Sequence, residues 1–140
     1  MKKSARGVTL VELMVVIAVL AVIASIAVPS YRGYMRRAQR ADATAALLQL
    51  RQGQEKFFLQ NGQYATGAQL TAAPPAGLGL GATSEHGHYN MVLNRPTPTT
   101  YTATATATGG QAGDAPCTSF TINEAGVRGS SPSGITTCWK

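Results

Sequence analysis

The chain has 140 residues, 44% of them hydrophobic, and a formal net charge of +6. This length leaves about 100 residues for one small domain once a membrane segment is set aside. The basic residues gather in two short clusters, one before and one after a long apolar run. The positive charge therefore does not indicate a nucleic-acid-binding face spread over the domain.

An uninterrupted apolar segment runs from Val8 to Val28, and Glu12 is its only charged residue. A helix of these 21 residues would be about 32 Å long, which matches the hydrocarbon core of a bilayer. A carboxylate in such a segment is costly unless it is paired, so Glu12 needs a functional explanation. The flanking basic residues are Lys2, Lys3 and Arg6 on one side and Arg32, Arg36, Arg37 and Arg40 on the other.

The helical pattern continues beyond this segment but becomes one-sided. Pro29 lacks a backbone donor and is expected to kink the helix. Apolar residues then recur at spacings of three, four and seven, which predicts one buried face made of Ala43, Leu47, Leu50 and Phe57. Asn61-Gly62 is a typical helix end. We therefore expect a helix from about residue 8 to 60, with an apolar stalk over 8–28 and an amphipathic half over 29–61.

Residues 62–140 are expected to form a globular head. Gly, Ala, Pro and Thr dominate 62–88, which predicts a loop. Alternating sequence predicts strands over 88–94, 100–108 and 117–123, and a turn or a short fourth strand over 126–129. A long helix followed by three or four short strands predicts an α+β fold, with a small antiparallel sheet packed on the rear half of the helix.

Two cysteines, Cys117 and Cys138, lie in the last quarter of the chain. An even number of cysteines beyond a membrane segment favours a disulfide in an oxidising compartment over a reduced buried pair. Their wide spacing, with no clustered histidine, is untypical of a metal site. The bridge would close a C-terminal loop with Trp139 beside it and would stabilise the head by about 3 kcal/mol.

Two ordinary explanations of the N-terminus remain open. The basic start and the small residues Ser25-Ile26-Ala27 are typical of a secretory signal, which would leave a secreted binding module that begins near Val28. A simple one-pass anchor would need only the apolar length. Neither accounts for Gly7 followed by Val-Thr-Leu-Val-Glu, and a signal peptide would place Glu12 inside its hydrophobic region.

The segment Gly7-Val8-Thr9-Leu10-Val11-Glu12-Leu13-Met14 resembles the processing site of type IV pilins and pseudopilins. Ala27-Val28-Pro29-Ser30-Tyr31 is similar to the proline-tyrosine segment of the same family. The head is most similar to the minor-pilin branch, over residues 40–50, 54–64, 126–129 and 138–139. The resemblance implies that a prepilin peptidase removes residues 1–7 as a leader by cutting after Gly7. It also implies methylation of the new N-terminus, Val8, where the family usually has Phe.

The resemblance also gives Glu12 and Pro29 a place in assembly. Cleavage would create a positive amine at Val8, four residues before Glu12 and close enough to pair with it within one helix. Family filaments imply instead that Glu12 pairs with the amine of a neighbouring subunit. Such a pair can enforce axial register, because an unpaired partner is expensive in a low dielectric.

The resemblance implies a structural or assembly subunit of a type IV pilus, most similar to a minor pilin. It would be inserted in the bacterial inner membrane with its head in the periplasm and then polymerised into a surface pilus. Its expected partners are other pilins, the prepilin peptidase and the inner-membrane assembly platform. We expect no catalytic residues, cofactor, metal or small-molecule ligand, and the alternative within this architecture is a type II secretion pseudopilin. The arginines after the stalk could contact DNA or anionic lipid, and lipid headgroups are favoured.

Overall fold

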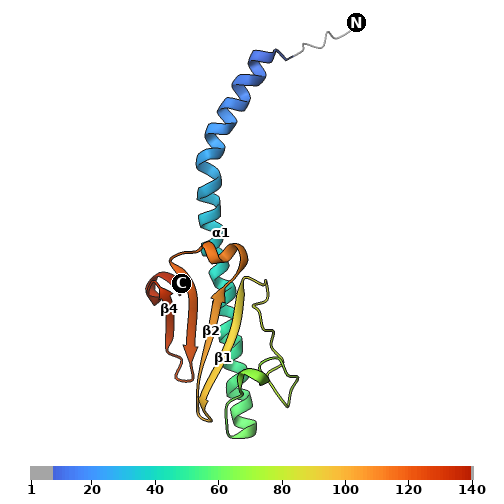
Figure 1. Ribbon diagram of the computed structural model, residues 1–140, viewed down its shortest axis with the longest axis vertical. Coiled ribbons are helices and arrows are strands. Elements are labelled where there is room, and N and C mark those ends of the chain that lie inside the picture. Colours follow the sequence, from blue (N-terminus) through green and yellow to red (C-terminus); the bar gives the residue numbers. More distant parts are fainter. Residues whose placement is uncertain (1–7, 140) are drawn as a thin grey trace. The chain divides into compact units, whose positions relative to one another are not determined.

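The structure is a computed structural model that describes residues 8–139. One long helix is followed by four strands, which confirms the predicted α+β fold, and by a short helix that the sequence did not predict (Figure 1). Within the described residues, 8–35 and 36–139 form two compact units. The elements are α1 (Leu10–Asn61), η1 (Gly67–Gln69), β1 (Tyr89–Thr97), β2 (Thr100–Ala107), η2 (Gly109–Gly113), β3 (Cys117–Asn123), β4 (Arg128–Pro132) and α2 (Ile135–Cys138).

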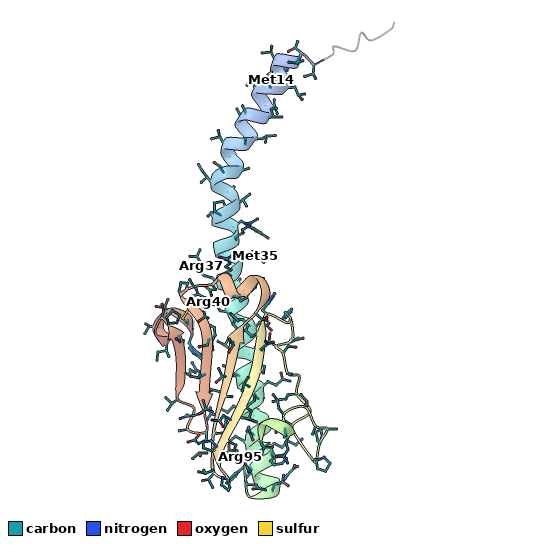
Figure 2. All side chains as sticks on the ribbon, in the orientation of Figure 1. Met14, Met35, Arg37, Arg40 and Arg95 are labelled. Atoms are coloured by element: carbon teal, nitrogen blue, oxygen red, sulfur yellow. A yellow bond between two sulfur atoms is a disulfide. The ribbon has the colours of Figure 1, made fainter. Side chains whose placement is uncertain are left out.

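The first unit contains the front part of α1, and we call its residues 8–28 the stalk. Every stalk side chain is exposed, and Figure 2 shows side chains that project from the helix on all sides. The most apolar window of α1 has a mean hydropathy of 2.8, so this helix is long and apolar enough to cross a membrane. The helix begins at Leu10 instead of at residue 8, and it continues through Pro29.

The second unit, residues 36–139, contains the rear part of α1 in addition to the residues predicted for the globular head, and the name head refers to this whole unit from here on. Its four strands form one antiparallel sheet in the order β1-β2-β3-β4, and the rear part of α1 lies behind β1 and β2 in Figure 1. Strand β4 is the predicted fourth strand, but it occupies Arg128–Pro132 instead of 126–129. The difference arises because Gly126 has a positive φ of 75° and its N–H donates to the carbonyl of Asn123, which places it in the turn.

The core lies between the inner face of the sheet and one face of α1. The predicted inward stripe is confirmed, since Ala43, Leu47, Leu50 and Phe57 are all at most 6% exposed. Small and large side chains alternate across the sheet, and Ala105 of β2 faces Met91 on one neighbouring strand and Phe120 on the other. The sheet contributes Tyr89, Met91, Leu93, Tyr101, Ala103, Ala105, Phe120 and Ile122 to this core.

One polar residue, Gln54, interrupts the apolar stripe of α1. Its side chain is fully buried and makes two hydrogen bonds to the backbone of Ala65. The amide nitrogen donates to the Ala65 carbonyl at 3.1 Å, and the amide oxygen accepts from the Ala65 N–H at 2.7 Å. A buried amide that satisfies a backbone donor and acceptor costs little to bury. Gln54 thereby fixes the start of the long loop between α1 and β1.

The contrast between Leu47 and its neighbour tests this assignment of the core. Leu47 is fully buried and Leu48 is 37% exposed. We expect Leu47→Ala to lower the free energy of unfolding by about 2–5 kcal/mol, because it leaves a cavity. Leu48→Ala, the matched control, should change it by less than about 1 kcal/mol. Chemical unfolding of the full chain in detergent, followed by the fluorescence of the single Trp139, measures both. Equal losses would contradict the packing described here.

Candidate functional site

The residues predicted for processing and assembly lie at the start of the stalk. Gly7 falls outside the described residues. Val8 is 72% exposed, and the Glu12 side chain is also exposed. Among residues 8–139, the Glu12 carboxylate makes no hydrogen bond or ion pair within the chain. The only carboxylate of the stalk is therefore available to a partner.

Thr9 is a residue of this region that the sequence reasoning missed. Its hydroxyl oxygen accepts a hydrogen bond of 3.2 Å from the backbone N–H of Glu12. This is an N-cap, and it explains why α1 begins at Leu10. The signal was present in the sequence, since Thr followed three residues later by Glu is the spacing of a capping box. Glu12 thus occupies the first turn, where the helix dipole favours a negative charge.

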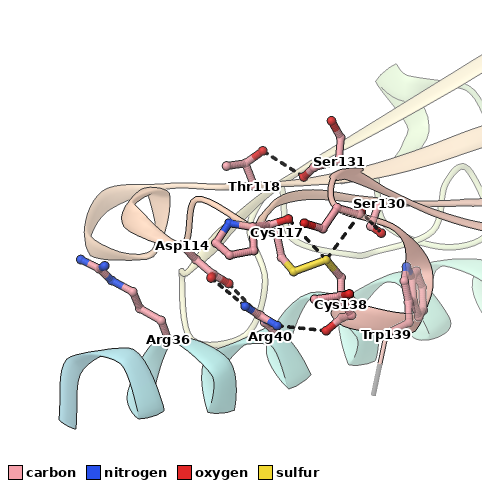
Figure 3. Close-up of a disulfide and its surroundings, with 12 residues drawn as sticks. Arg36, Arg40, Asp114, Cys117, Thr118, Ser130, Ser131, Cys138 and Trp139 are labelled. Carbon is pink, nitrogen blue, oxygen red and sulfur yellow. Dashed lines mark hydrogen bonds and ion pairs between the residues drawn. A yellow bond between two sulfur atoms is a disulfide. The ribbon is translucent and has the colours of Figure 1, made fainter. Parts of the chain in front are cut away.

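The arginines that follow the stalk do not form one uniform stripe. Arg40 makes a two-pronged ion pair with Asp114, at 2.7 Å from Nε and 2.8 Å from Nη2, and Nη1 donates to the Thr137 carbonyl (Figure 3). The hydrogen bonds to Asp114 and its negative charge outweigh the effect of burial and raise the pKa of Arg40 above its ordinary value. Arg36 donates to the Gly113 carbonyl at 2.8 Å. Both side chains thus tie α1 to the segment between β2 and β3.

The predicted disulfide is confirmed. Cys117, at the start of β3, is bonded to Cys138, at the end of α2, and both are at most 1% exposed. Trp139 lies beside the bridge, as expected. Its Nε1 donates to the Gly129 carbonyl at 2.8 Å and its ring packs edge-on against Phe120. The C-terminal segment is therefore held against β3 by a covalent bond and an aromatic contact, and against β4 by a hydrogen bond.

A second polar cluster attaches the turn before β1 to α1. The Asp42 side chain on α1 is only 6% exposed. It accepts a hydrogen bond of 2.6 Å from the Ser84 hydroxyl and lies 3.1 Å from Nδ1 of His86. Burial alone would raise the pKa of Asp42, but the hydrogen bonds from Ser84 and His86 outweigh it and hold the pKa below its ordinary value. No local pattern in the sequence indicates this contact, because its partners are more than 40 residues apart.

An exposed apolar stalk and a helix-and-sheet head closed by a disulfide agree with two family models. Residues 2–28 match the prokaryotic N-terminal methylation motif. Residues 29–121 match the model described as type IV minor pilin ComP, DNA uptake sequence receptor. The chain belongs to the ComP family of type IV minor pilins. Pilins are structural subunits and not enzymes, and the family confirms the expected resemblance to the minor-pilin branch.

Two solved structures share the fold of this minor pilin. A type IV pilin from Shewanella oneidensis is 23% identical, with a TM-score of 0.53 over 75% of this chain and 98% of that one. The non-core minor pilin PilV of Neisseria meningitidis is 20% identical, with a TM-score of 0.53 over 76% and 95% of the two chains. At these identities the likeness concerns the fold alone. A comparison with curated proteins gives no match.

The lowered pKa of Asp42 predicts an acid-sensitive contribution to stability. A carboxylate with a depressed folded pKa stabilises the fold above its unfolded pKa of about 4, and this contribution is lost as the pH falls through the folded pKa. We expect the unfolding midpoint of the wild type to fall more steeply below pH 5 than that of Asp42→Asn. Glu85→Gln, which removes a neighbouring exposed acid, is the control and should keep the wild-type slope. Parallel pH profiles for wild type and Asp42→Asn would contradict the role of this cluster.

Proposed function

We propose that this minor pilin is made as a prepilin, cut between Gly7 and Val8, and built into a type IV pilus through its stalk. A prepilin peptidase would make the cut and could methylate the Val8 amine, in keeping with the methylation motif over residues 2–28. The observation that carries the proposal is the lone carboxylate of Glu12. It is exposed at the start of a helix whose other stalk side chains are uncharged and equally exposed.

The energetics of the stalk support a membrane stage followed by assembly. The stalk contains fourteen Val, Leu, Ile or Met side chains, and burial of each is worth roughly 1.5–3 kcal/mol. The total, on the order of 20–40 kcal/mol as an upper bound, keeps the stalk out of water. Lipid and a bundle of stalks satisfy apolar surface about equally, so apolar area does not by itself favour the filament. Glu12 would make the filament more favourable than lipid, because its carboxylate can pair with a neighbour's Val8 amine in the filament and lacks that partner in lipid.

The proposed route also assigns the compartments. The stalk would span the inner membrane, and the disulfide is consistent with a head in the oxidising periplasm. Loss of the leader removes three of the twelve basic residues and none of the six acidic ones, which leaves the mature chain with a charge of +3. The proposed partners are other pilin subunits and the assembly platform. We also propose that Pro29, which lies inside α1, has a role in assembly, because it removes one backbone donor from the helix.

The role of Glu12 can be separated from processing in one experiment. We expect Glu12→Ala to be cleaved and inserted normally, so that mass spectrometry of membrane extracts finds a chain starting at Val8, with or without one methyl group. Its amount in sheared surface filaments should fall at least tenfold by immunoblot, because the pair that sets register is lost.

Val11→Ala is the matched control, since it trims an exposed stalk side chain without removing a charge. It should enter filaments as the wild type does. Equal incorporation of Glu12→Ala would remove the register role of this carboxylate. A wild-type chain starting near Val28 would instead support an ordinary signal peptide and would overturn the processing step.

We further infer that the head binds duplex DNA, because the family model that matches residues 29–121 is described as a DNA uptake sequence receptor. The charges of the head limit how such binding would work. Arg36, Arg40 and Arg95 are engaged in hydrogen bonds within the head. Four other basic side chains remain among residues 36–139. Binding to DNA phosphates, which does not depend on the base sequence, would therefore be weak. Contacts to base edges would have to carry the preference for one sequence.

This distribution of charge predicts a shallow salt dependence. In fluorescence anisotropy with labelled duplexes, we expect the logarithm of the binding constant to fall with the logarithm of salt concentration with a slope no steeper than about −4. A duplex with the recognised sequence should bind at least tenfold more tightly than a scrambled duplex of the same composition. A pilin from the same organism that lacks the ComP match serves as the protein control. No difference between the duplexes, or no binding at low salt, would remove DNA recognition from the function of this head.

A further inference from the structure

Two of the four arginines that follow the stalk, Arg32 and Arg37, are exposed and make no hydrogen bond or ion pair within residues 8–139, and Arg37 is the one that belongs to the head. Arg36 and Arg40 hold the segment between β2 and β3, whereas the Arg37 side chain is exposed. Within residues 8–139, Arg37 makes no hydrogen bond, and the only ion pairs are Arg40–Asp114 and His86–Asp42. An unpaired guanidinium on a rigid helix is a ready donor to a planar or tetrahedral anion.

Arg37 stands at the edge of a groove beside the disulfide. The groove has a volume of about 560 Å³ and is lined by Arg37, Ala38, Arg40, Ala41, Pro116, Thr137 and Cys138. No acidic side chain lines it. The charge of Arg40 is neutralised by Asp114, so Arg37 gives the groove its one uncompensated positive charge. The remaining surface comes mainly from small side chains, which suits a partner with one negative charge next to apolar atoms.

The position of Arg37 in the chain indicates where such a partner would come from. It follows the last residue of the apolar stalk, Val28, by nine residues. Four arginines follow the stalk and three basic residues precede it, which is an unfavourable balance for a head exported from the cytoplasm. Anionic lipid attracts basic residues next to a membrane segment by about 1 kcal/mol each. DNA needs a row of phosphate contacts to bind well, whereas this groove offers a single one, at Arg37.

We propose that this groove binds the phosphodiester headgroup of an anionic phospholipid, with the phosphate on the Arg37 guanidinium and the glycerol end of the lipid against Ala38 and Ala41. The contact would hold the head of an unassembled subunit at the outer leaflet of the inner membrane. It would be given up when the subunit leaves the bilayer for the filament. The inference rests on the membrane stage of the proposed function and on nothing in its DNA-binding part.

The test uses the full 140-residue chain in a neutral detergent, titrated with phosphatidylglycerol or with phosphatidylcholine of the same acyl chains. Native mass spectrometry counts the retained lipids. We expect one phosphatidylglycerol to be retained in preference to phosphatidylcholine, and Arg37→Gln to reduce the phosphatidylglycerol-bound fraction about fivefold. Lys56→Gln is the matched control, because it removes the same charge from an exposed position of α1 outside the groove. It should bind lipid as the wild type does.

A second variant tests the groove apart from its charge. Ala41→Leu keeps every arginine and replaces one good helix former by another at an exposed position. The larger side chain fills part of the groove, so this variant should also weaken phosphatidylglycerol binding. Equal binding of the two lipids would overturn the proposal, and so would equal losses of lipid binding in Arg37→Gln and Lys56→Gln. Full displacement of the lipid by millimolar inorganic phosphate would overturn it as well. The proposal would also fail if Arg37→Gln weakened the binding of a DNA duplex and left lipid binding unchanged. The titration requires neither cleavage nor assembly, so it can fail or succeed independently of the proposed function.

Discussion

A single helix in this minor pilin has to satisfy two kinds of surroundings, and the rest of the structure depends on how its sequence changes along its length. Over the stalk, side chains on all sides are apolar, apart from Glu12 and a few small residues. From Ala43 onward only one face is apolar, and that face is covered by the sheet. The first part exposes apolar side chains on all sides, whereas the second buries its apolar face in the core of the head.

The head has few large aliphatic side chains, and it compensates with specific links from α1 to the irregular segments around the sheet. Arg40 holds Asp114, Asp42 holds Ser84, and Gln54 holds Ala65. The disulfide adds a covalent link between β3 and the C-terminal segment. Each link ties a segment with little apolar surface of its own to an element that the core already fixes. A small domain with a thin core commonly needs such additional constraints.

The sequence predicted well what depends on periodicity and composition. The inward stripe of α1, the antiparallel sheet and the Cys117–Cys138 bridge are all present. It predicted less well what depends on local backbone chemistry. The helix begins two residues late because Thr9 caps it, and the predicted C-terminal loop contains the short helix α2. Contacts between distant residues, such as Arg40 with Asp114, had no local signal at all. The roles of Gly7, Val8, Glu12 and Pro29 stay predictions, because they concern other molecules.

Several of the links that hold the head end on backbone atoms of their partners. Gln54 bonds to the backbone N–H and carbonyl of Ala65, Arg36 to the Gly113 carbonyl, and Arg95 to the Tyr64 carbonyl. A bond to the backbone does not depend on which side chain the partner residue carries. The loops of this pilin can therefore exchange most of their surface residues during evolution and still be held in the same place. Such an arrangement separates the shape of the subunit from the chemistry that its surface presents.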